Sequence, residues 1–236
     1  MNYQIITIPI LPLGIVNAFL IKYSDGCILV DSGLPNTEQK VEQTLKKYTL
    51  KFSDIKYIVI THAHIDHAGN ALKLKQLSGA KIIAHVNDLD YYQGNKKMTF
   101  CPTSTFAKLF FKTGAVSKKY PTFTPDILLK DDETYTFDQL DIQVIPTHGH
   151  TDGSISVIVN KQHAIVGDLV ASGILIGGIM FKNRPKRPPF EDNPALVSQQ
   201  LKALNNCGCH KFYLGHGGPL NKKQIESHCI NLDQLN

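Results

Sequence analysis

The sequence lacks any uninterrupted run of about 18 apolar residues, so we expect no transmembrane helix and no membrane partner. Its apolar start, residues 1–26, contains no basic n-region and is interrupted by Pro9 and Pro12. We therefore expect two strands joined by the sequence PLG rather than a signal peptide. No low-complexity linker divides the chain, which favours a single domain over residues 1–236.

Cysteine is scarce, with five residues in 236, and only Cys207 and Cys209 lie close together. An odd number with this spacing does not suggest a disulfide framework, and a reducing cytoplasm fits better. The sequence CGCH at residues 207–210 lacks the second half of a zinc knuckle. We therefore expect ordinary thiols near a turn.

Strong charge is also lacking: the net charge is +5, and Lys and Arg are spread along the chain. Because a nucleic-acid footprint usually needs a dense basic stripe, we expect no nucleic-acid partner. A hydrophobic fraction of 42% and a charged fraction of 19% are typical of a soluble globular protein. The sequence leaves a homodimer open.

Strand and helix patterns alternate along the chain, which predicts an α/β domain. The helix expected at residues 36–48 has Val41, Leu45 and Tyr48 on one face, with Asn36 or Thr37 as its cap. A second helix is expected at residues 70–77 and a third at 194–204. Strands are expected at residues 4–9, 15–22, 27–31, 55–60, 80–85, 133–137, 141–146, 154–160, 163–168 and 211–216. Residues 87–125 should form a mostly helical excursion, and residues 171–194 should form a second excursion, for which no secondary structure is predicted.

One short stretch, THAHIDHAGN at residues 61–70, holds His62, His64, Asp66 and His67. Residues two apart in an extended chain point to the same side, so His62 and His64 should share a direction. Asp66 and His67 come where a helix begins, so their side chains can diverge from the first pair. The alternative, a histidine-rich surface loop, explains this spacing poorly. Four potential ligands suggest either spare ligands or two metal ions.

Similar residues follow other apolar strands. His148 and His150 come after one strand, Asp168 ends another, and His216 follows a third, just before glycines that permit close backbone approach. Each of these signals is weak alone, since Asp168 fits a turn and His216 fits a capping role. Open α/β folds place their sites at strand ends, so together they predict a shared pocket.

The motifs HAHIDH, GHTDGS, GD and GHGG, in this order, resemble those of the metallo-β-lactamase-fold hydrolases. The resemblance runs from Asp31 to His216 and implies a four-layer αββα sandwich with a metal site at one edge. It implies one metal held by His62, His64 and His150, and a second held by Asp66, His67 and His216, with Asp168 bridging both. His148 stands where the family often has proline, so it should support a ligand from behind or form a pocket wall. Asp31 matches the family's first motif and should orient a ligand or the cluster loop.

Two neighbouring cations sharing a hydroxide provide a strong nucleophile at neutral pH, which makes hydrolysis the expected reaction. Asp66 is the expected catalytic residue, handling the proton of the leaving group. We expect two Zn ions, although Fe or Mn would also suit this donor set.

The resemblance defines the substrate less closely than the fold. True metallo-β-lactamases usually lack an aspartate where Asp168 stands, glyoxalase II enzymes carry a further helical domain, and acyl-homoserine lactonases have a tyrosine where this chain reads LVASG. A small-molecule ester, lactone or thioester remains the favoured substrate of a lactonase-like or glyoxalase II-like enzyme. The alternatives are a mononuclear iron persulfide dioxygenase and a phosphodiesterase or nuclease of the same fold.

The excursions are expected to shape the substrate pocket. Their aromatic residues either line an apolar cavity or pack a small core of their own. Cationic residues at positions 182–187 either attract an anionic substrate or belong to a solvated loop. The candidate pocket residues are Tyr91, Tyr92, Phe106, Phe110 and Phe111.

Overall fold

Apolar runs bounded by turns form the strands, which assemble into two sheets. The computed structural model describes residues 3–137 and 140–235. Within these residues the first sheet has six strands, in the order β1 (Gln4–Leu11), β2 (Val16–Tyr23), β3 (Gly26–Val30), β4 (Ile55–Val59), β5 (Lys81–His85) and β6 (Ile127–Leu129). The second also has six, in the order β14 (Leu220–Asn221), β13 (Lys211–Tyr213), β10 (His163–Ile165), β9 (Ile155–Val159), β8 (Ile142–Pro146) and β7 (Tyr135–Thr136).

Strict alternation along the central strands separates two hydrophobic cores. In β2, Phe19 and Ile21 lie between the two sheets, whereas Ala18 and Leu20 face the helices on the outside of the first sheet. Successive strand residues point to opposite faces, so a strand covered on both sides must be apolar throughout. Strand β9 (Ile155–Val159) of the second sheet is likewise buried at every position.

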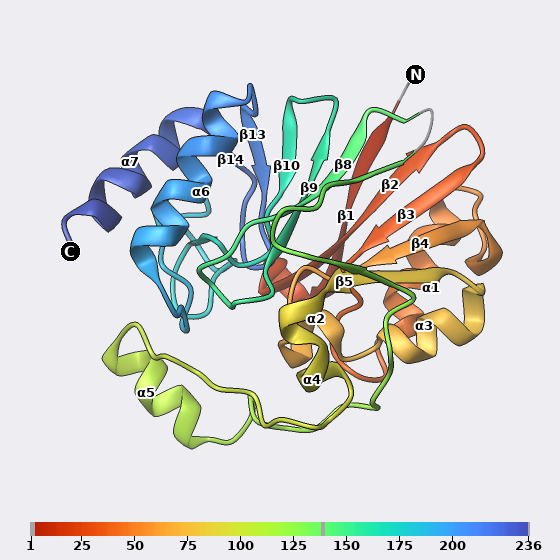
Figure 1. Ribbon diagram of the computed structural model, residues 1–236, viewed down its shortest axis with the longest axis horizontal. Helices are drawn as coiled ribbons and strands as arrows, with labels where there is room; N and C mark the ends of the chain where they lie inside the picture. The colour runs from red at the N-terminus through yellow and green to blue at the C-terminus, as the bar shows by residue number, and fades with distance from the viewer. Residues whose placement is uncertain (1–2, 138–139, 236) are drawn as a thin grey trace.

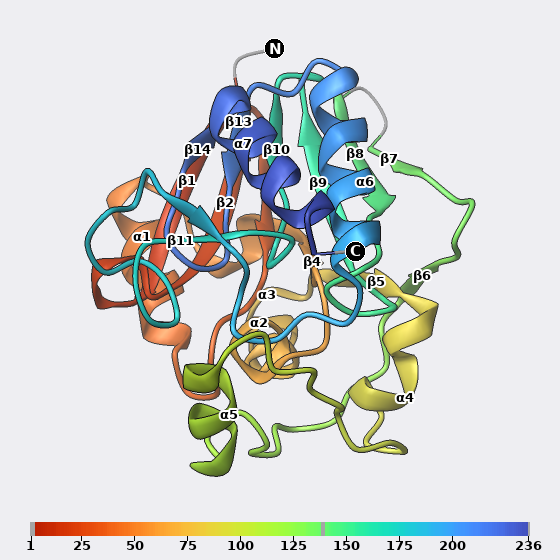
Figure 2. The ribbon, with the colours of Figure 1, turned by 90° about the vertical axis from the view of Figure 1, so that its left-hand side faces the viewer.

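Helices cover the outer face of each sheet and complete four layers (Figures 1 and 2). The first sheet carries α1 (Glu38–Lys47) and α3 (Ala71–Ser78), and the second carries α6 (Pro194–Asn206) and α7 (Lys222–Asp233). This is the αββα arrangement that the motifs predict. Thr37, one of the two predicted caps, is the N-cap residue of α1, but its hydroxyl makes no capping hydrogen bond and instead donates to the carbonyl of Leu34 at 2.6 Å.

The first excursion contains less helix than predicted. Residues 87–125 include only two short helices, α4 (Leu89–Tyr92) and α5 (Thr105–Lys112), joined by turns and extended chain. The second excursion contains a small ribbon of β11 (Ala171–Ser172) and β12 (Pro185–Lys186). The excursions meet where the backbone N–H of Thr103 donates to the carbonyl of Pro189 at 2.9 Å. Three 3-10 turns also occur, at Pro12–Gly14, Phe52–Asp54 and Val86–Asp88.

Parallel pairing brings the motif-bearing strand ends to one edge. In the first sheet β3, β4 and β5 run parallel, and in the second β10 runs parallel to β13. The carboxyl ends of parallel strands share an edge, so the polar residues that follow them converge there. The five cysteines are free thiols. Among the described residues, no helix is long and apolar enough to cross a membrane.

Candidate metal centre

Three imidazoles from two sheets meet at the strand-end edge. His62 and His64 follow β4, and His150 follows β8. Nε2 of His62, Nδ1 of His64 and Nε2 of His150 form a triangle in which each edge is 3.1 Å. The predicted common direction of His62 and His64 is therefore observed, and the second sheet supplies the third nitrogen.

The neighbours of His62 fix its tautomer. The Thr61 hydroxyl lies 2.9 Å from Oδ1 of Asp31 and 3.0 Å from Nδ1 of His62. A carboxylate can only accept, so the hydroxyl donates its single hydrogen to Asp31 and accepts from Nδ1–H of His62. Nε2 of His62 then presents a lone pair to the other two nitrogens.

Burial keeps this triangle uncharged. Removal from water lowers the pKa of His64 to about 3 and that of His150 to about 4, and it lowers the pKa of His62 well below its ordinary value. The repulsion between neighbouring imidazoles contributes to the low pKa of His62. Metal ions require neutral imidazole, so the three rings are held in the state that binds a cation.

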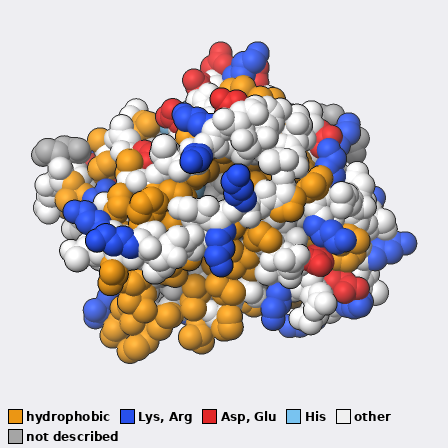
Figure 3. Space-filling model, turned by 90° about the horizontal axis from the view of Figure 1, so that it is seen from below, with side chains coloured by type: hydrophobic (Ala, Val, Ile, Leu, Met, Phe, Trp, Pro, Cys, Tyr) orange, Lys and Arg blue, Asp and Glu red, His pale blue; other side chains and the backbone are white. Residues whose placement is uncertain are grey.

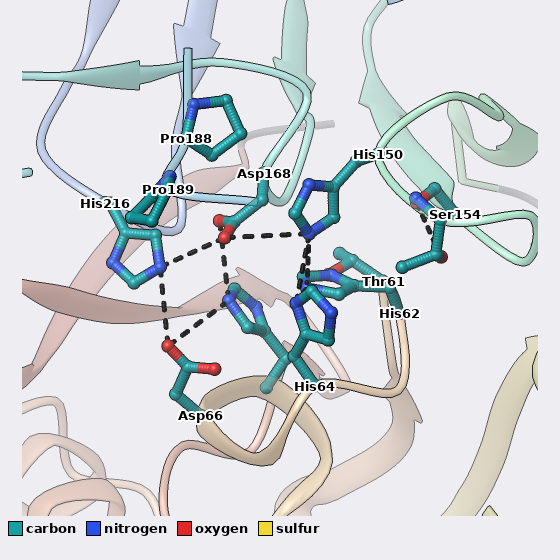
Figure 4. A network of polar contacts seen from close by, with 12 residues as sticks. Thr61, His62, His64, Asp66, His150, Ser154, Asp168, Pro188, Pro189 and His216 are labelled. Carbon is teal, nitrogen blue, oxygen red and sulfur yellow. Dashed lines mark hydrogen bonds and ion pairs between the residues drawn. The ribbon is translucent and has the colours of Figure 1, made fainter. Parts of the chain in front are cut away.

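A second set of side chains lies beside the first. Asp66 and His67 belong to α2 (Ile65–Ala68), and His216 follows β13. Nε2 of His216 lies 3.4 Å from Oδ2 of Asp66 and 3.0 Å from Oδ2 of Asp168. Asp168 also lies 3.9 Å from Nε2 of His150, so its carboxylate stands between the two sets (Figure 4).

Acceptor atoms face one another in this second set. Nδ1 of His67 donates to Asp31 at 2.7 Å, and Nδ1 of His216 donates to the carbonyl of Ile15, so both Nε2 atoms carry lone pairs in the neutral rings. Those lone pairs point at the carboxylates of Asp66 and Asp168. Nε2 of His67 and Oδ1 of Asp168 are buried and have no hydrogen-bond partner. Lone pairs that converge without a hydrogen between them fit a bound cation.

Without a metal ion, protons would occupy this space. Burial alone lowers the pKa of His216, but the Asp168 and Asp66 carboxylates raise it to about 10. Burial raises the pKa of Asp66, but His67 and His216 bring it below its ordinary value. The charges of this set therefore favour a positive species between the carboxylates, and a metal ion would displace the protons.

Asp31 ties the second set to the cluster loop. It directly follows β3 and is fully buried, and besides the bond from His67 it accepts one from the backbone N–H of Thr61 at 2.8 Å. Ser32 adds a second tie, because its hydroxyl donates to the carbonyl of His67 at 2.6 Å. The bonds that Asp31 accepts from His67 and Thr61 agree with the orienting role expected for it.

Asp88 is a positioning residue that the sequence did not reveal. Its buried carboxylate accepts from the backbone N–H of Ala63 at 2.9 Å and from that of Gly153 at 3.2 Å, which joins the loop of His64 to the loop of His150. Burial raises its pKa to about 6. A lone aspartate in AHVNDL gives no sequence signal, because the loops that it joins are brought together only by the sheets.

A cavity that opens to solvent lies above the two sets, and its empty space of about 350 Å³ includes open solvent. Phe100 forms one wall and stacks on the ring of His64, with centroids 5.0 Å apart. The remaining lining is mostly apolar. Ile65 comes from α2, and the two excursions supply Phe110, Val116, Ile176, Pro189 and Phe190. Sequence reasoning named Phe110 but missed Phe100 and Phe190, which carry no motif.

The other predicted pocket residues lie elsewhere. Tyr92 is fully buried in the core outside the first sheet, and Tyr91 packs against that core, so their assignment to the pocket is wrong. Phe106 stacks on Phe110, with centroids 6.0 Å apart, but it does not line the cavity. Phe111 touches Phe190 from outside the cavity. Strand and helix periodicity did not determine which way these rings turn.

His148 faces away from both sets. Its Nδ1 lies 2.5 Å from the carbonyl of Asp152, and its Nε2 lies 3.5 Å from the carboxylate of Asp131. The ring of His85 is 5.0 Å away, centroid to centroid. His148 does not line the cavity and belongs to neither ligand set. The structure therefore does not support its expected role as a pocket wall or as a support for a ligand.

Comparison with protein families places this site in context. The family model of the metallo-beta-lactamase superfamily matches residues 11–216, which include every side chain of both sets. The chain belongs to the metallo-beta-lactamase superfamily. As a member, it is a metal-dependent hydrolase, and the two sets are its His and Asp clusters able to bind metal.

Relatives of this superfamily member are distant. The probable metallo-hydrolase YflN of Bacillus subtilis is 24% identical, with 94% of this chain and 88% of that protein covered. The hydroxyacylglutathione hydrolase of Prochlorococcus marinus strain NATL1A is 28% identical, with 77% of this chain and 56% of that protein covered. The metallo-beta-lactamase family protein TTHA1429 of Thermus thermophilus has the same fold, with a TM-score of 0.68 and 20% identity, covering 98% of this chain and 79% of that one.

Proposed function

We propose that the chain hydrolyses a small-molecule ester, lactone or thioester with two metal ions. His62, His64 and His150 would hold one ion, Asp66, His67 and His216 the other, and Asp168 both. The observation that carries the proposal is the convergence of these metal-ligating side chains beneath a cavity with apolar walls. Two Zn ions suit this nitrogen-rich set, and Fe or Mn would fit the same donors.

The cations supply activation of a water molecule and polarisation of a substrate oxygen. The protein supplies position and proton transfer. Asp66 lines the cavity with 24% of its side chain exposed, so it can face both the metal set and the substrate. Its lowered pKa keeps Asp66 ionised at rest, so it would first receive the proton that the attacking water releases and then pass it on. We assign it the proton transfer to the leaving group.

The cavity supports an uncharged acyl substrate. The mostly aromatic and aliphatic lining would hold the carbon skeleton of an ester, lactone or thioester. Among the described residues, no Lys or Arg lines it, which disfavours the anionic backbone of a phosphodiester. The name of the Prochlorococcus marinus relative denotes hydrolysis of an acyl compound, the same class of reaction.

The second ligand set favours two metals over one. A mononuclear iron dioxygenase would need only the triangle of His62, His64 and His150. Asp66, His67 and His216 would then bind no metal ion, although burying charged side chains costs desolvation free energy. We also propose a cytoplasmic location, which the free thiols support.

The test combines metal analysis with a substrate panel. The chain would be loaded separately with Zn, Fe or Mn, its metal content measured, and each form assayed on an aliphatic lactone, an acyl thioester, a β-lactam and bis(p-nitrophenyl) phosphate. We expect about two metal equivalents and turnover of the lactone or thioester. One iron per chain with oxygen uptake would instead establish the dioxygenase, and turnover of the phosphodiester alone the phosphodiesterase.

A matched pair of histidine variants locates the activity. His216→Ala should lose about one metal equivalent and most of the turnover. His210→Ala removes an exposed histidine six positions earlier in the chain and should change neither. Equal losses in both variants would separate the reaction from the proposed site.

A further inference from the structure

Helix α5 (Thr105–Lys112) exposes the side chains that a helix normally buries. Leu109 is 67% exposed, Phe111 42% and Phe106 36%, whereas Ala107 is the buried residue of the helix. An amphipathic helix gains its stability by covering apolar side chains. The apolar residues of α5 are therefore available to something outside the chain.

The second excursion adds more apolar side chains to the same face. Residues 174–181 form a small hairpin around the bridge between Ile174 and Ile179, and its exposed apolar residues are Ile174, Leu175, Met180 and Phe181. Phe111 of α5 contacts Phe190, with centroids 6.3 Å apart, which ties α5 to the second excursion. The exposed apolar side chains of α5 and of residues 174–181 constitute the apolar face. Figure 3 shows a broad patch of hydrophobic side chains on the face seen from below.

Lys and Arg predominate in the segments that carry the apolar face. Residues 91–125 and 169–190 contain ten of the 25 Lys and Arg residues and none of the 20 Asp and Glu residues. Lys108 and Lys112 flank Leu109 and Phe111 on α5, and Lys182 follows Phe181; all three lysines are exposed. Glu191, outside these segments, pairs with Arg187 at 2.5 Å. The remainder of the chain has a net negative charge, so the fold concentrates the cations here.

We propose that the apolar face docks on an anionic lipid surface. Exposed aliphatic and aromatic tips would enter the interface while Lys108, Lys112 and Lys182 contact the headgroups. A second copy of the chain, docked through the same face, would bring its lysines against these lysines, and the like charges would repel. A polynucleotide would pair with the cations and stack on rings, but it would leave Leu109, Leu175 and Met180 without a partner. An anionic bilayer satisfies both the charge and the aliphatic side chains.

Docking would place the bilayer beside the cavity. Phe110 of α5 and Ile176 of the hairpin line the cavity, while their neighbours Leu109 and Leu175 point to solvent. The sequence predicted no membrane partner because no segment can span a bilayer. Peripheral binding needs no spanning segment, and the two excursions are separated by more than 40 residues in the sequence. The proposal stands independently of the proposed hydrolysis.

Flotation of the metal-loaded full chain with lipid vesicles tests the proposal. One vesicle preparation would contain phosphatidylcholine alone, and the other about one-third phosphatidylglycerol. We expect at least about tenfold tighter binding to the anionic vesicles, weakened by added salt. No flotation with anionic vesicles, or equal flotation with both preparations, would overturn the proposal. Dimerisation through the apolar face, detected as loss of a dimer in Leu109→Glu, would also overturn it.

Matched variants separate a docking surface from general stickiness. Leu109→Glu should weaken binding to anionic vesicles by at least about tenfold, because it removes an apolar anchor and adds an anion. Ile230→Glu makes the same change on α7, where Ile230 is 59% exposed, and should bind as the parent does. Lys108→Glu should also weaken binding strongly. Equal binding by all variants would refute the proposal, as would competition by single-stranded RNA that displaces the chain completely.

Discussion

The carboxylate of Asp31 lies 2.7 Å from Nδ1 of His67, although 36 positions separate the two residues. Asp31 directly follows β3 and His67 lies in α2, so the contact joins the first sheet to the helix that carries two of the three residues of the second ligand set. The contact fixes the tautomer of His67 and raises the basicity of its free nitrogen. It makes Asp31 part of the metal centre without making it a ligand.

Asp31→Asn should weaken the second metal position selectively. The amide keeps the size of the side chain but loses the charge that orients His67. We expect the affinity for one metal equivalent to fall about 10- to 100-fold while the other is retained. Chelator competition measures both affinities. Asp25→Asn, at an exposed turn, is the control, and an unchanged Asp31→Asn variant would remove the residue from the centre.

The sequence predicted much of this cluster because several of its residues directly follow strands. His62 and His64 occupy alternate positions after an apolar strand, so their shared direction follows from backbone geometry. Asp168 and His216 stand where parallel strands end, and only one edge of the sheets can hold them. The resemblance supplied what spacing could not, which is the division into two sets around Asp168.

Other features depended on packing that no local pattern encodes. Tyr92 and Phe110 both looked like pocket aromatics, yet Tyr92 enters the core and Phe110 the cavity, because the path of the excursion decides which ring turns inward. Asp88 joins two loops from different sheets, so its role exists only in the assembled fold. Short strands such as β6 and β14 were missed because two or three residues carry no periodic signal.

His148→Ala should leave the metal content unchanged. Its ring bonds to the carbonyl of Asp152 on the far side of the loop, so the loss should cost about 1 kcal/mol of stability and no metal. His150→Ala, two positions later, should lose at least one metal equivalent. Metal analysis of the two variants side by side makes the comparison. Loss of metal from His148→Ala would show that the resemblance assigned the wrong histidine.

Gly215→Ala should disturb the bridging carboxylate. A Cβ atom at this position would lie 2.3 Å from Oδ1 of Asp168 and 2.5 Å from Cε1 of His67, so both ligands must move. We expect loss of metal and of most activity, since ligand positions tolerate little displacement. Gly114→Ala is the control, because nothing lies within 4 Å of its Cβ position and only its positive φ of 72° adds strain. Full metal content in Gly215→Ala would contradict the geometry.

Phe110→Ala should raise KM and leave kcat nearly unchanged. Phe110 lines the cavity, so loss of its ring would remove apolar contact with the substrate. For an acyl group that fills the cavity, we expect KM to rise about tenfold. Phe106→Ala is the matched control, because that ring stacks on Phe110 from outside the cavity. Steady-state kinetics on a short-chain and a long-chain acyl substrate would separate the two, since only the longer chain should respond strongly to Phe110→Ala. A folded Phe110→Ala variant with parental KM on both substrates would place the binding surface on Phe100 and Phe190 instead.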